Sequence, residues 1–383
     1  MNVLHVFNPE HDLALASGLS NFTAPHAGRR LRADLGYLPA LWAGDDDYVL
    51  VEHVEQARLA YGRLRARVGG APRRFVDKSQ LGRLAIDRVE PWGWDMALRS
   101  SLIRYGVSPE ACASEAAITA VRDCSHRRYA AEVLSRLIPP STFHFPPSTF
   151  LFPLSSFLEI PVEATSVETV EACLSQHPRL VLKAPWSSSG RGVRFIDGSL
   201  SDYHRGWLRN IIAQQGSVMV EPMYPKVKDF GMEFEALPDG QIRYLGLSLF
   251  DTRNGAYTGN IIASEEDKLD MISRYVPVSS ILDIREKLTS ALSDVFTSHA
   301  SSQSSHPYTG PFGVDMMILS RPDGQGFSIH PCVEINLRRT MGHVAIDMAN
   351  AFTSSPFHLS TFPLPRVMQI TLSDKYRIHV RKK

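Results

Sequence analysis

The sequence predicts an α/β (α+β) protein built from more than one structural unit. Its 383 residues exceed what a single compact core usually holds, which indicates two or three units. Residues 1–110 alternate short apolar runs, typical of buried strands, with segments of helical patterning. The rest of the chain contains strand-like apolar runs that are interrupted by single charged residues and separated by loops rich in proline, serine or glycine.

Residues 1–110 are predicted to form a separate α/β unit. The expected elements are strands at 3–7 and 48–51 and helices at 26–36 and 54–67. A polar turn follows the first strand directly. Because ligands of open α/β sheets bind beyond the carboxyl ends of the strands, the side chains of this turn are predicted to face a substrate. These side chains are Asn8, Glu10, His11 and Asp12. The alternative is a helix cap whose acidic residues complement the helix dipole.

A short buried strand is predicted over residues 180–185, with Lys183 near its end. A loop rich in serine and glycine follows at once. Backbone N–H groups of such a loop, together with the lysine ammonium, can bind phosphate oxygens. The loop is neither a Walker loop nor a dinucleotide fingerprint, and a plain hairpin turn is the alternative. The loop residues predicted to bind phosphate are Ser187, Ser188, Ser189, Gly190 and Gly192.

Two later strands, at 314–318 and 333–338, each carry polar side chains between apolar ones. Side chains alternate along a strand, so Glu334 and Asn336 project from the same face, and a hairpin turn between the strands can bring Asp315 alongside them. Buried carboxylates are costly unless they are paired or bind a cation. Three oxygen ligands of this kind suit Mg²⁺. The alternative is a pair of core strands whose carboxylates pair with Arg338 and Arg339.

Charge and cysteine content exclude several classes of function. Forty-one basic and 40 acidic residues nearly cancel, so nothing favours nucleic acid or a membrane surface as a partner. The chain has no apolar run of the roughly 18 residues that a spanning helix needs and no signal-peptide pattern, so a cytoplasmic location is expected. The four cysteines are widely spaced without a C-x-x-C pair, which argues against a disulfide framework or a zinc site.

The order of these features resembles the ATP-grasp family. The matching features are Lys183 on a strand, the serine- and glycine-rich loop, a strand at 218–223, then Asp315 and the Glu334-x-Asn336 pair. The resemblance implies an ATP-grasp fold that binds ATP and Mg²⁺. It implies an N-terminal α/β domain over 1–110, a central subdomain with the phosphate loop over 111–215, and a C-terminal lobe with the hinge and the magnesium site over 216–383.

Further roles are implied by the resemblance, residue by residue. Glu221 matches the hinge residue at adenine and ribose, and either Asp229 or Glu233 matches a ribose-binding acid. Arg338 matches a position that faces the transferred phosphoryl group, although it is equally a partner for neighbouring carboxylates. The family's first lysine is absent, and Arg127 or Arg128 is expected to supply that charge.

The implied activity is ligation. MgATP would phosphorylate a carboxylate, and an amine or similar nucleophile would then displace phosphate. The partners are therefore small molecules, and a polar turn near 253–260 could contact the second of them through Arg253, Tyr257 or Asn260, with a plain hairpin as the alternative. A small-molecule kinase and a nucleotide-binding regulatory protein without turnover are the competing functions, and the missing first lysine is the only hint of the latter.

Overall fold

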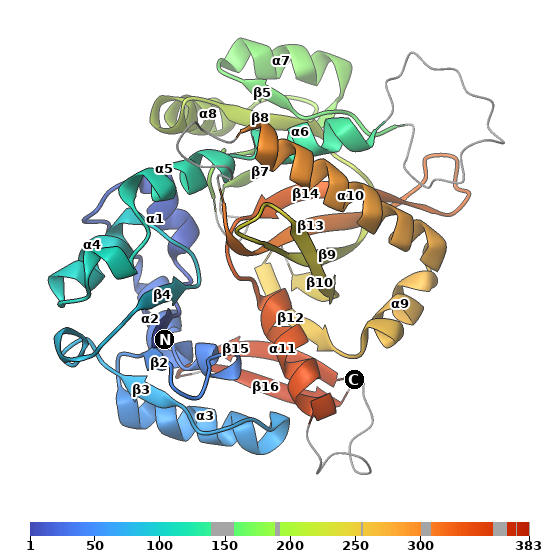
Figure 1. Cartoon of the computed structure of the whole chain (residues 1–383). Helices are drawn as coiled ribbons and strands as arrows, with labels where there is room; N and C mark the ends of the chain where they lie inside the picture. Colours follow the sequence, from blue (N-terminus) through green and yellow to red (C-terminus); the bar gives the residue numbers. More distant parts are fainter. Residues whose placement is uncertain are drawn as a thin grey trace.

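The fold is known from a computed structural model that describes residues 1–138, 157–187, 192–253, 256–299, 308–354, 366–372 and 374–382. In these residues the strands form four sheets of four strands each, and helices cover the sheets (Figure 1). The predicted α/β class is confirmed, since a parallel N-terminal sheet precedes antiparallel sheets.

The N-terminal sheet has the strand order β3-β2-β1-β4, and all its pairs are parallel. Its strands are β1 (Val3–Val6), β2 (Tyr48–Leu50), β3 (Arg74–Val76) and β4 (Arg88–Pro91). The helices of this region are α1 (His11–Ser17), α2 (His26–Leu35), α3 (Val54–Val68) and α4 (Met96–Arg104). The two strands and two helices predicted here are confirmed. Parallel strands place their carboxyl ends at one edge, which is where Asn8 and Glu10 follow β1.

A second sheet, β5-β8-β6-β7, carries the lysine strand and is antiparallel. Its strands are β5 (Val162–Ala164), β6 (Arg179–Lys183), β7 (Val193–Asp197) and β8 (Val218–Pro222). The helices α5 (Glu115–Cys124) and α6 (Arg128–Leu137) precede this sheet, and α7 (Val167–Gln176) and α8 (Asp202–Gln215) lie between its strands in the chain. Residues of α7 and α8 share an apolar cluster with the sheet, so these helices pack against it.

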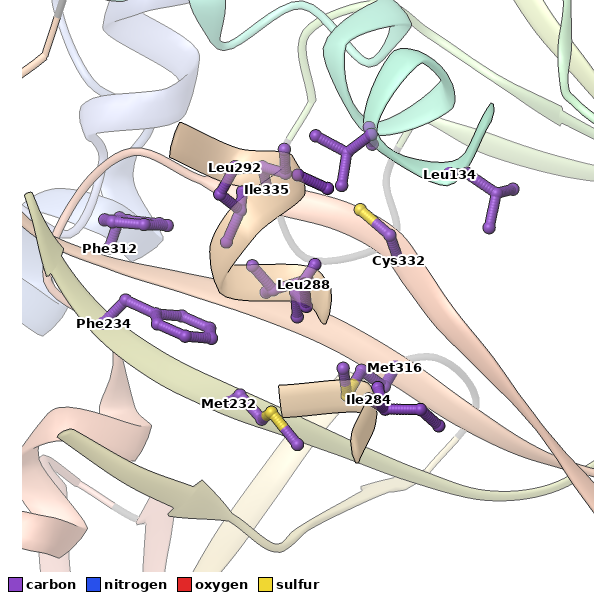
Figure 2. Packing of buried hydrophobic residues seen from close by; sticks show 14 of the residues in the cluster. Leu134, Met232, Phe234, Ile284, Leu288, Leu292, Phe312, Met316, Cys332 and Ile335 are labelled. Atoms are coloured by element: carbon purple, nitrogen blue, oxygen red, sulfur yellow. The ribbon is translucent and has the colours of Figure 1, made fainter. Parts of the chain in front are cut away.

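The third sheet, β10-β9-β13-β14, forms the centre of the molecule. Its strands are β9 (Lys226–Ala236), β10 (Ile242–Ser248), β13 (Gly310–Ser320) and β14 (Phe327–Asn336), and the helices α9 (Glu265–Ser273) and α10 (Val278–Ser298) follow β12 in the chain. Side chains alternate between the two faces of each strand. On one face, Phe234, Phe312 and Met316 pack against Leu288 and neighbouring residues of α10 (Figure 2). The opposite face is left for polar side chains.

The last sheet, β11-β12-β15-β16, joins the C-terminal strands to the N-terminal unit. Its strands are β11 (Phe250–Arg253), β12 (Ala256–Ile262), β15 (Arg366–Leu372) and β16 (Tyr376–Lys382), and α11 (Met341–Ser354) lies beside it (Figure 1). One apolar cluster contains Phe7 and Trp92 from the N-terminal region together with Val344 and Met348 of α11. The N-terminal sheet is therefore anchored to the C-terminal part of the chain by a shared core.

Two further observations concern the chain as a whole. The four cysteines are free thiols, and Cys112, Cys124 and Cys332 are buried. Among the helices that the structure describes, none combines the length and the apolar character needed to cross a membrane.

Candidate active site

The predicted acidic residues lie on the polar face of the central sheet. The turn that begins at Arg321 closes the predicted hairpin, with the Gly324 N–H donating to the Arg321 carbonyl at 3.0 Å. In the resulting register Asp315 lies directly opposite Glu334, and Gly313 lies opposite Asn336. The hairpin thus brings the three predicted metal ligands onto neighbouring positions of two strands.

Asp315 and Glu334 form a pair of like charges. Burial raises the pKa of Asp315, and the carboxylates of Glu334 and Glu233 raise it further, against an opposing hydrogen bond from Asn336. A divalent cation between Asp315, Glu334 and Asn336 would relieve this repulsion, so the residues present fit the metal implied by the resemblance. No three histidine, cysteine, aspartate or glutamate side chains in the described part of the chain gather as metal ligands; the predicted set differs because its third member is an amide.

Arg127 connects the acidic pair to the loop that follows the lysine strand. Its guanidinium lies 2.7 Å from the Glu334 carboxylate and donates to the Ser187 hydroxyl at 3.0 Å and to the Ala184 carbonyl at 3.0 Å. The Arg127 side chain is buried. The residue directly precedes α6, between the end of the lysine strand and the central sheet. Segments more than 140 residues apart in the sequence meet at this guanidinium.

Arg128, in contrast, does not reach the site. Its side chain is 52% exposed, and its nearest carboxylate is that of Glu163, at 3.8 Å. Successive residues at the start of a helix point in different directions, so only one arginine of the pair can face inward. Of the two arginines, Arg127 is therefore the one that contacts the acidic pair.

Lys183 is paired with Glu221. The two side chains come from neighbouring strands, β6 and β8, and their charged groups form a buried ion pair. The sequence around Lys183 contains no such partner, because Glu221 lies on a different strand 38 positions away. The two residues that the resemblance assigns to the phosphates and to the adenine thus lie side by side.

The loop after β6 is described only at its two ends. A side chain at Gly192 would collide with the Ser187 side chain and would lie 3.0 Å from the Ala184 Cβ, so the absence of a Cβ at Gly192 lets the loop return closely to its starting strand. The Ala184 N–H donates to the Gly192 carbonyl at 2.8 Å. The predicted phosphate ligands Ser188, Ser189 and Gly190 lie outside the described residues.

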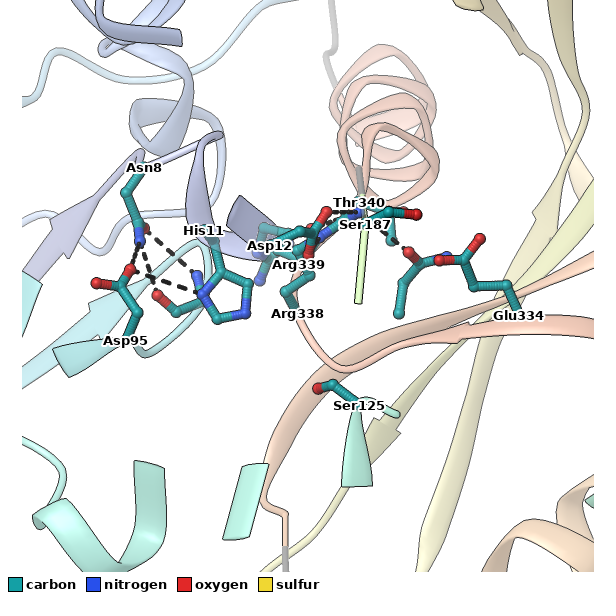
Figure 3. A network of polar contacts seen from close by, with 12 residues as sticks. Asn8, His11, Asp12, Asp95, Ser125, Ser187, Glu334, Arg338, Arg339 and Thr340 are labelled. Carbon is teal, nitrogen blue, oxygen red and sulfur yellow. Dashed lines mark hydrogen bonds and ion pairs between the residues drawn. The ribbon is translucent and has the colours of Figure 1, made fainter. Parts of the chain in front are cut away.

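Arg338 is held by the N-terminal helix α1. Its guanidinium donates two bonds to the Asp12 carboxylate, at 2.7 and 2.8 Å, and one to the Asn336 amide oxygen at 3.0 Å (Figure 3). This bidentate geometry is the strong form of an arginine–carboxylate pair. Burial is the largest single effect and would raise the pKa of Asp12, but the charge and hydrogen bonds of Arg338, together with the charges of His11 and Arg127, lower it. Asp12, Glu334 and Asn336 line the same crevice of about 20 Å³.

Of the two candidates for a ribose-binding acid, Glu233 is the one whose charge acts on Asp315, one of the predicted metal ligands. Glu233 is buried and pairs with His343 at 3.0 Å, in a space left by Gly313 and Gly342, which have no side chains. Asp229 instead binds the Lys226 ammonium at 2.8 Å and accepts from the Thr252 hydroxyl at 2.7 Å.

We expect Gly342→Ala to destabilise the protein by roughly 1–3 kcal/mol, because a Cβ at Gly342 would overlap the Glu233 carboxylate. Chemical unfolding measures this loss. Gly62→Ala in α3 is the matched control, since nothing lies near its added Cβ, and it is expected to stabilise by about 0.5–1 kcal/mol. Equal effects of the two substitutions would contradict the packing of Glu233 described here.

The residues predicted for a second substrate form a buried network. The Tyr257 hydroxyl donates to the Asn260 amide oxygen at 2.5 Å, and the Asn260 amide donates to the Ser248 hydroxyl at 2.9 Å. Because these groups satisfy one another, they need no ligand to be stable in the interior. The Arg253 side chain is outside the described part of the structure.

His330 was not anticipated from the sequence. It lies on β14, is 1% exposed, and neither ring nitrogen has a hydrogen-bond partner among the described residues. The Tyr224 ring packs against it with centroids 5.6 Å apart. Burial, followed by the nearby Lys183 charge, lowers the pKa of His330 to about 3. The only local signal was a histidine within the mostly apolar stretch 327–333 of β14.

This histidine is expected to make the protein sensitive to acid. The unfolded chain protonates it near pH 6.5 and the folded chain only near its lowered pKa, so stability is complete above about pH 6.5 and falls by about 1.4 kcal/mol per unit as the pH drops below it. Unfolding free energies measured against pH should show a shallower slope for His330→Leu than for the wild type. His379→Leu, at an exposed position of β16, is the control; a slope that changes equally in both variants would contradict the assignment.

The polar side chains that follow β1 lie in two different environments. Asp12 faces Arg338, whereas Asn8 donates to the Gly93 carbonyl at 2.8 Å and to Asp95 at 3.1 Å, and buried His11 lies beside Asp95 (Figure 3). Glu10 precedes α1 but makes no side-chain capping bond. The Glu10 side chain therefore does not cap the helix.

Comparisons with known proteins give similarity in three dimensions alone. No family model matches the chain, and no curated protein matches it in sequence. The chain is similar to N5-carboxyaminoimidazole synthetase from Staphylococcus aureus complexed with ADP, at 13% identity and a TM-score of 0.46, over 97% of this chain and 82% of that one. It is similar to a biotin carboxylase from Campylobacter jejuni in a beta-gamma-ATP complex, at 10% identity and a TM-score of 0.49, over 96% of this chain and 75% of that one.

A third similar structure is N5-carboxyaminoimidazole ribonucleotide synthetase from Thermus thermophilus. Its identity is 12% and its TM-score 0.45, over 98% of this chain and 84% of that one.

Proposed function

We propose that this chain is an ATP- and Mg²⁺-dependent ligase of the ATP-grasp type, which activates a carboxylate as an acyl phosphate for attack by an amine. The observation that carries the proposal is the position of Arg127, which contacts Ser187 after the lysine strand and Glu334 of the acidic pair. A phosphate-binding loop and a metal-binding carboxylate must be this close for one triphosphate to meet both.

The residues of the chain are assigned the following roles. Asp315, Glu334 and Asn336 would hold Mg²⁺, which supplies charge neutralisation for the transferred phosphoryl group. Lys183 and Arg127 would bind phosphate oxygens, as charge-assisted donors do elsewhere. Glu221 would bind the adenine and ribose, and Glu233, the more buried of the two acids, is the better candidate for a second polar contact to the nucleotide than Asp229.

Arg338 is the proposed group that offsets charge at the reacting phosphorus. Its planar donors are oriented by the two bonds to Asp12 and by Asn336, so little reorganisation is needed when charge develops. The loop bounded by Ser187 and Gly192 is proposed to exclude water, because a free acyl phosphate would hydrolyse. The cytoplasmic location stays a prediction from the sequence.

The direct test is incubation of the purified protein with ATP, Mg²⁺ and pooled carboxylates and amines. Nucleotides, phosphate and new masses are then separated. ADP, free phosphate and a condensed mass are expected. ADP with a phosphorylated alcohol would indicate a kinase in place of a ligase. Nucleotide binding without turnover across the pools would contradict the proposal that the chain is an enzyme.

A further inference from the structure

A cavity of about 310 Å³ lies in the N-terminal part of the chain, away from the proposed site of phosphoryl transfer. All of its lining residues fall between Val6 and Tyr105. They come from the carboxyl ends of β1 and β2, from α1, α2 and α4 (Figure 1), and from the segments 20–24 and 78–81. The volume is in the range of small-molecule sites, roughly 300–1,000 Å³, and its position beyond the strand ends is where α/β sheets bind ligands.

The charges around this cavity are not balanced by one another. Its charged lining residues are the basic Arg29, Arg32, Lys78 and Arg104 and the acidic Glu10, Glu52 and Asp95. Arg32 pairs with both Glu10 and Glu52, and Lys78 lies 3.7 Å from Glu52. Arg29 and Arg104 make no ion pair with any residue in the described part of the chain. Two cations at the rim are therefore available to an anionic group.

Glu10 adds a buried acceptor that needs a hydrogen-bond donor. Its side chain is 7% exposed, one carboxylate oxygen is paired with Arg32, and the other, Oε2, has no hydrogen-bond partner among the described residues. A buried oxygen without a donor is costly, and native proteins rarely leave one unpaired. Burial also raises the pKa of Glu10, with the Arg32 charge acting in the opposite direction. A ligand that carries an N–H donor would satisfy this oxygen.

Part of the remaining wall is apolar. Phe7, Leu50, Leu81 and Leu102 line the cavity and are all buried. We propose that the cavity is a binding site for a small zwitterion of the amino-acid type with an apolar side chain. Its ammonium would donate to Glu10, its carboxylate would meet Arg29 or Arg104, and its side chain would lie against this wall.

This site is separate from the place where phosphoryl transfer is proposed. None of the residues assigned to nucleotide or metal lines the cavity, and α1 lies between the two, with Glu10 facing the cavity and Asp12 bonded to Arg338. The zwitterion therefore binds without nucleotide and is not consumed in the reaction. Binding also survives Glu334→Gln, so a failure of the proposed ligase activity would leave this inference intact.

The test is calorimetric titration and thermal shift of the intact, nucleotide-free protein with a panel of L-amino acids that have apolar side chains, L-leucine and L-phenylalanine among them. At least one is expected to bind and to raise the melting temperature. For L-leucine the matched probes are 3-methylbutylamine, which lacks the carboxylate, and 4-methylpentanoate, which lacks the ammonium. Each should bind at least about tenfold more weakly than the zwitterion.

Variants then place the ligand in the cavity. Glu10→Gln and the double variant Arg29→Ala with Arg104→Ala should each weaken binding about tenfold or more. Arg30→Ala is the matched control, because Arg30 lies on the same helix as Arg29 but pairs with Asp34 and does not line the cavity. The proposal is overturned if no member of the panel binds, if the single-charge probes bind as well as the zwitterion, if Arg30→Ala weakens binding as much as the double variant, or if the bound amino acid is incorporated into product.

Discussion

Glu334→Gln and Asp315→Asn are each expected to abolish Mg²⁺-dependent ATP turnover, by at least about a hundredfold, while the fold is retained. The two carboxylates face each other across neighbouring strands, and Arg127 joins Glu334 to the end of the lysine strand. Removing either charge weakens cation binding directly. Steady-state turnover is measured as a function of Mg²⁺ concentration. Unaltered activity at limiting Mg²⁺ would contradict the proposal that these carboxylates bind Mg²⁺.

Stability separates a metal ligand from a structural carboxylate. Because repulsion and burial raise the pKa of Asp315, its ionised form costs stability in the absence of a cation, so Asp315→Asn should not lower the melting temperature near neutral pH. A large loss of stability in this variant would indicate a structural role. Glu235→Gln is the control for the sheet, since Glu235 lies on β9 and pairs with Arg243 away from the acidic pair.

Lys183→Met is expected to weaken ATP binding or phosphoryl transfer about ten- to a hundredfold. One charge-assisted contact contributes on the order of 1.5–3 kcal/mol, which corresponds to this range. The variant also leaves Glu221 buried without its partner, which is expected to cost stability by itself. Nucleotide affinity, turnover and melting temperature should therefore be measured on the same samples.

The double variant Lys183→Met with Glu221→Gln distinguishes these two effects. Neutralising Glu221 removes the unpaired buried charge, so stability should recover, whereas nucleotide binding should stay weak because the lysine is still missing. Recovery of ATP affinity and rate together with stability would show that Lys183 acts only as a partner of Glu221. Lys375→Met, at an exposed lysine near Gln56, should change neither quantity.

The register of the acidic hairpin is an example of what the sequence alone could predict. Glu334 and Asn336 share a face because side chains alternate, and the turn at Arg321–Gly324 closes the hairpin, so the meeting of Asp315 with Glu334 was predictable. The strand that carries Lys183 and the N-terminal strands at 3–7 and 48–51 were predictable from their apolar runs. Each of these features depends on residues that are close together in the chain.

Pairs between distant segments were decided only by the tertiary structure. The sequence offered Arg127 and Arg128 as equals, and only the packing of α6 against the central sheet turned Arg127 inward. The bond between Asp12 and Arg338 joins positions 326 residues apart, and the partner of Lys183 comes from another strand. The cavity near Glu10 likewise needs α1, α2 and α4 at once.

The physical reason lies in the range of the interactions. The alternation of side chains, the residues of turns and the apolar runs involve only a few neighbouring residues. They can therefore be recognised in the sequence, and they predict the strands, the hairpin and the candidate ligands. The partner of a charge is chosen by which elements pack together, and that choice follows from the burial of apolar faces across the whole chain, such as the cluster that joins Trp92 to Met348. The residues proposed as metal ligands were therefore identified from the sequence, whereas the pairing of the arginines and the lysine around them was decided by tertiary packing.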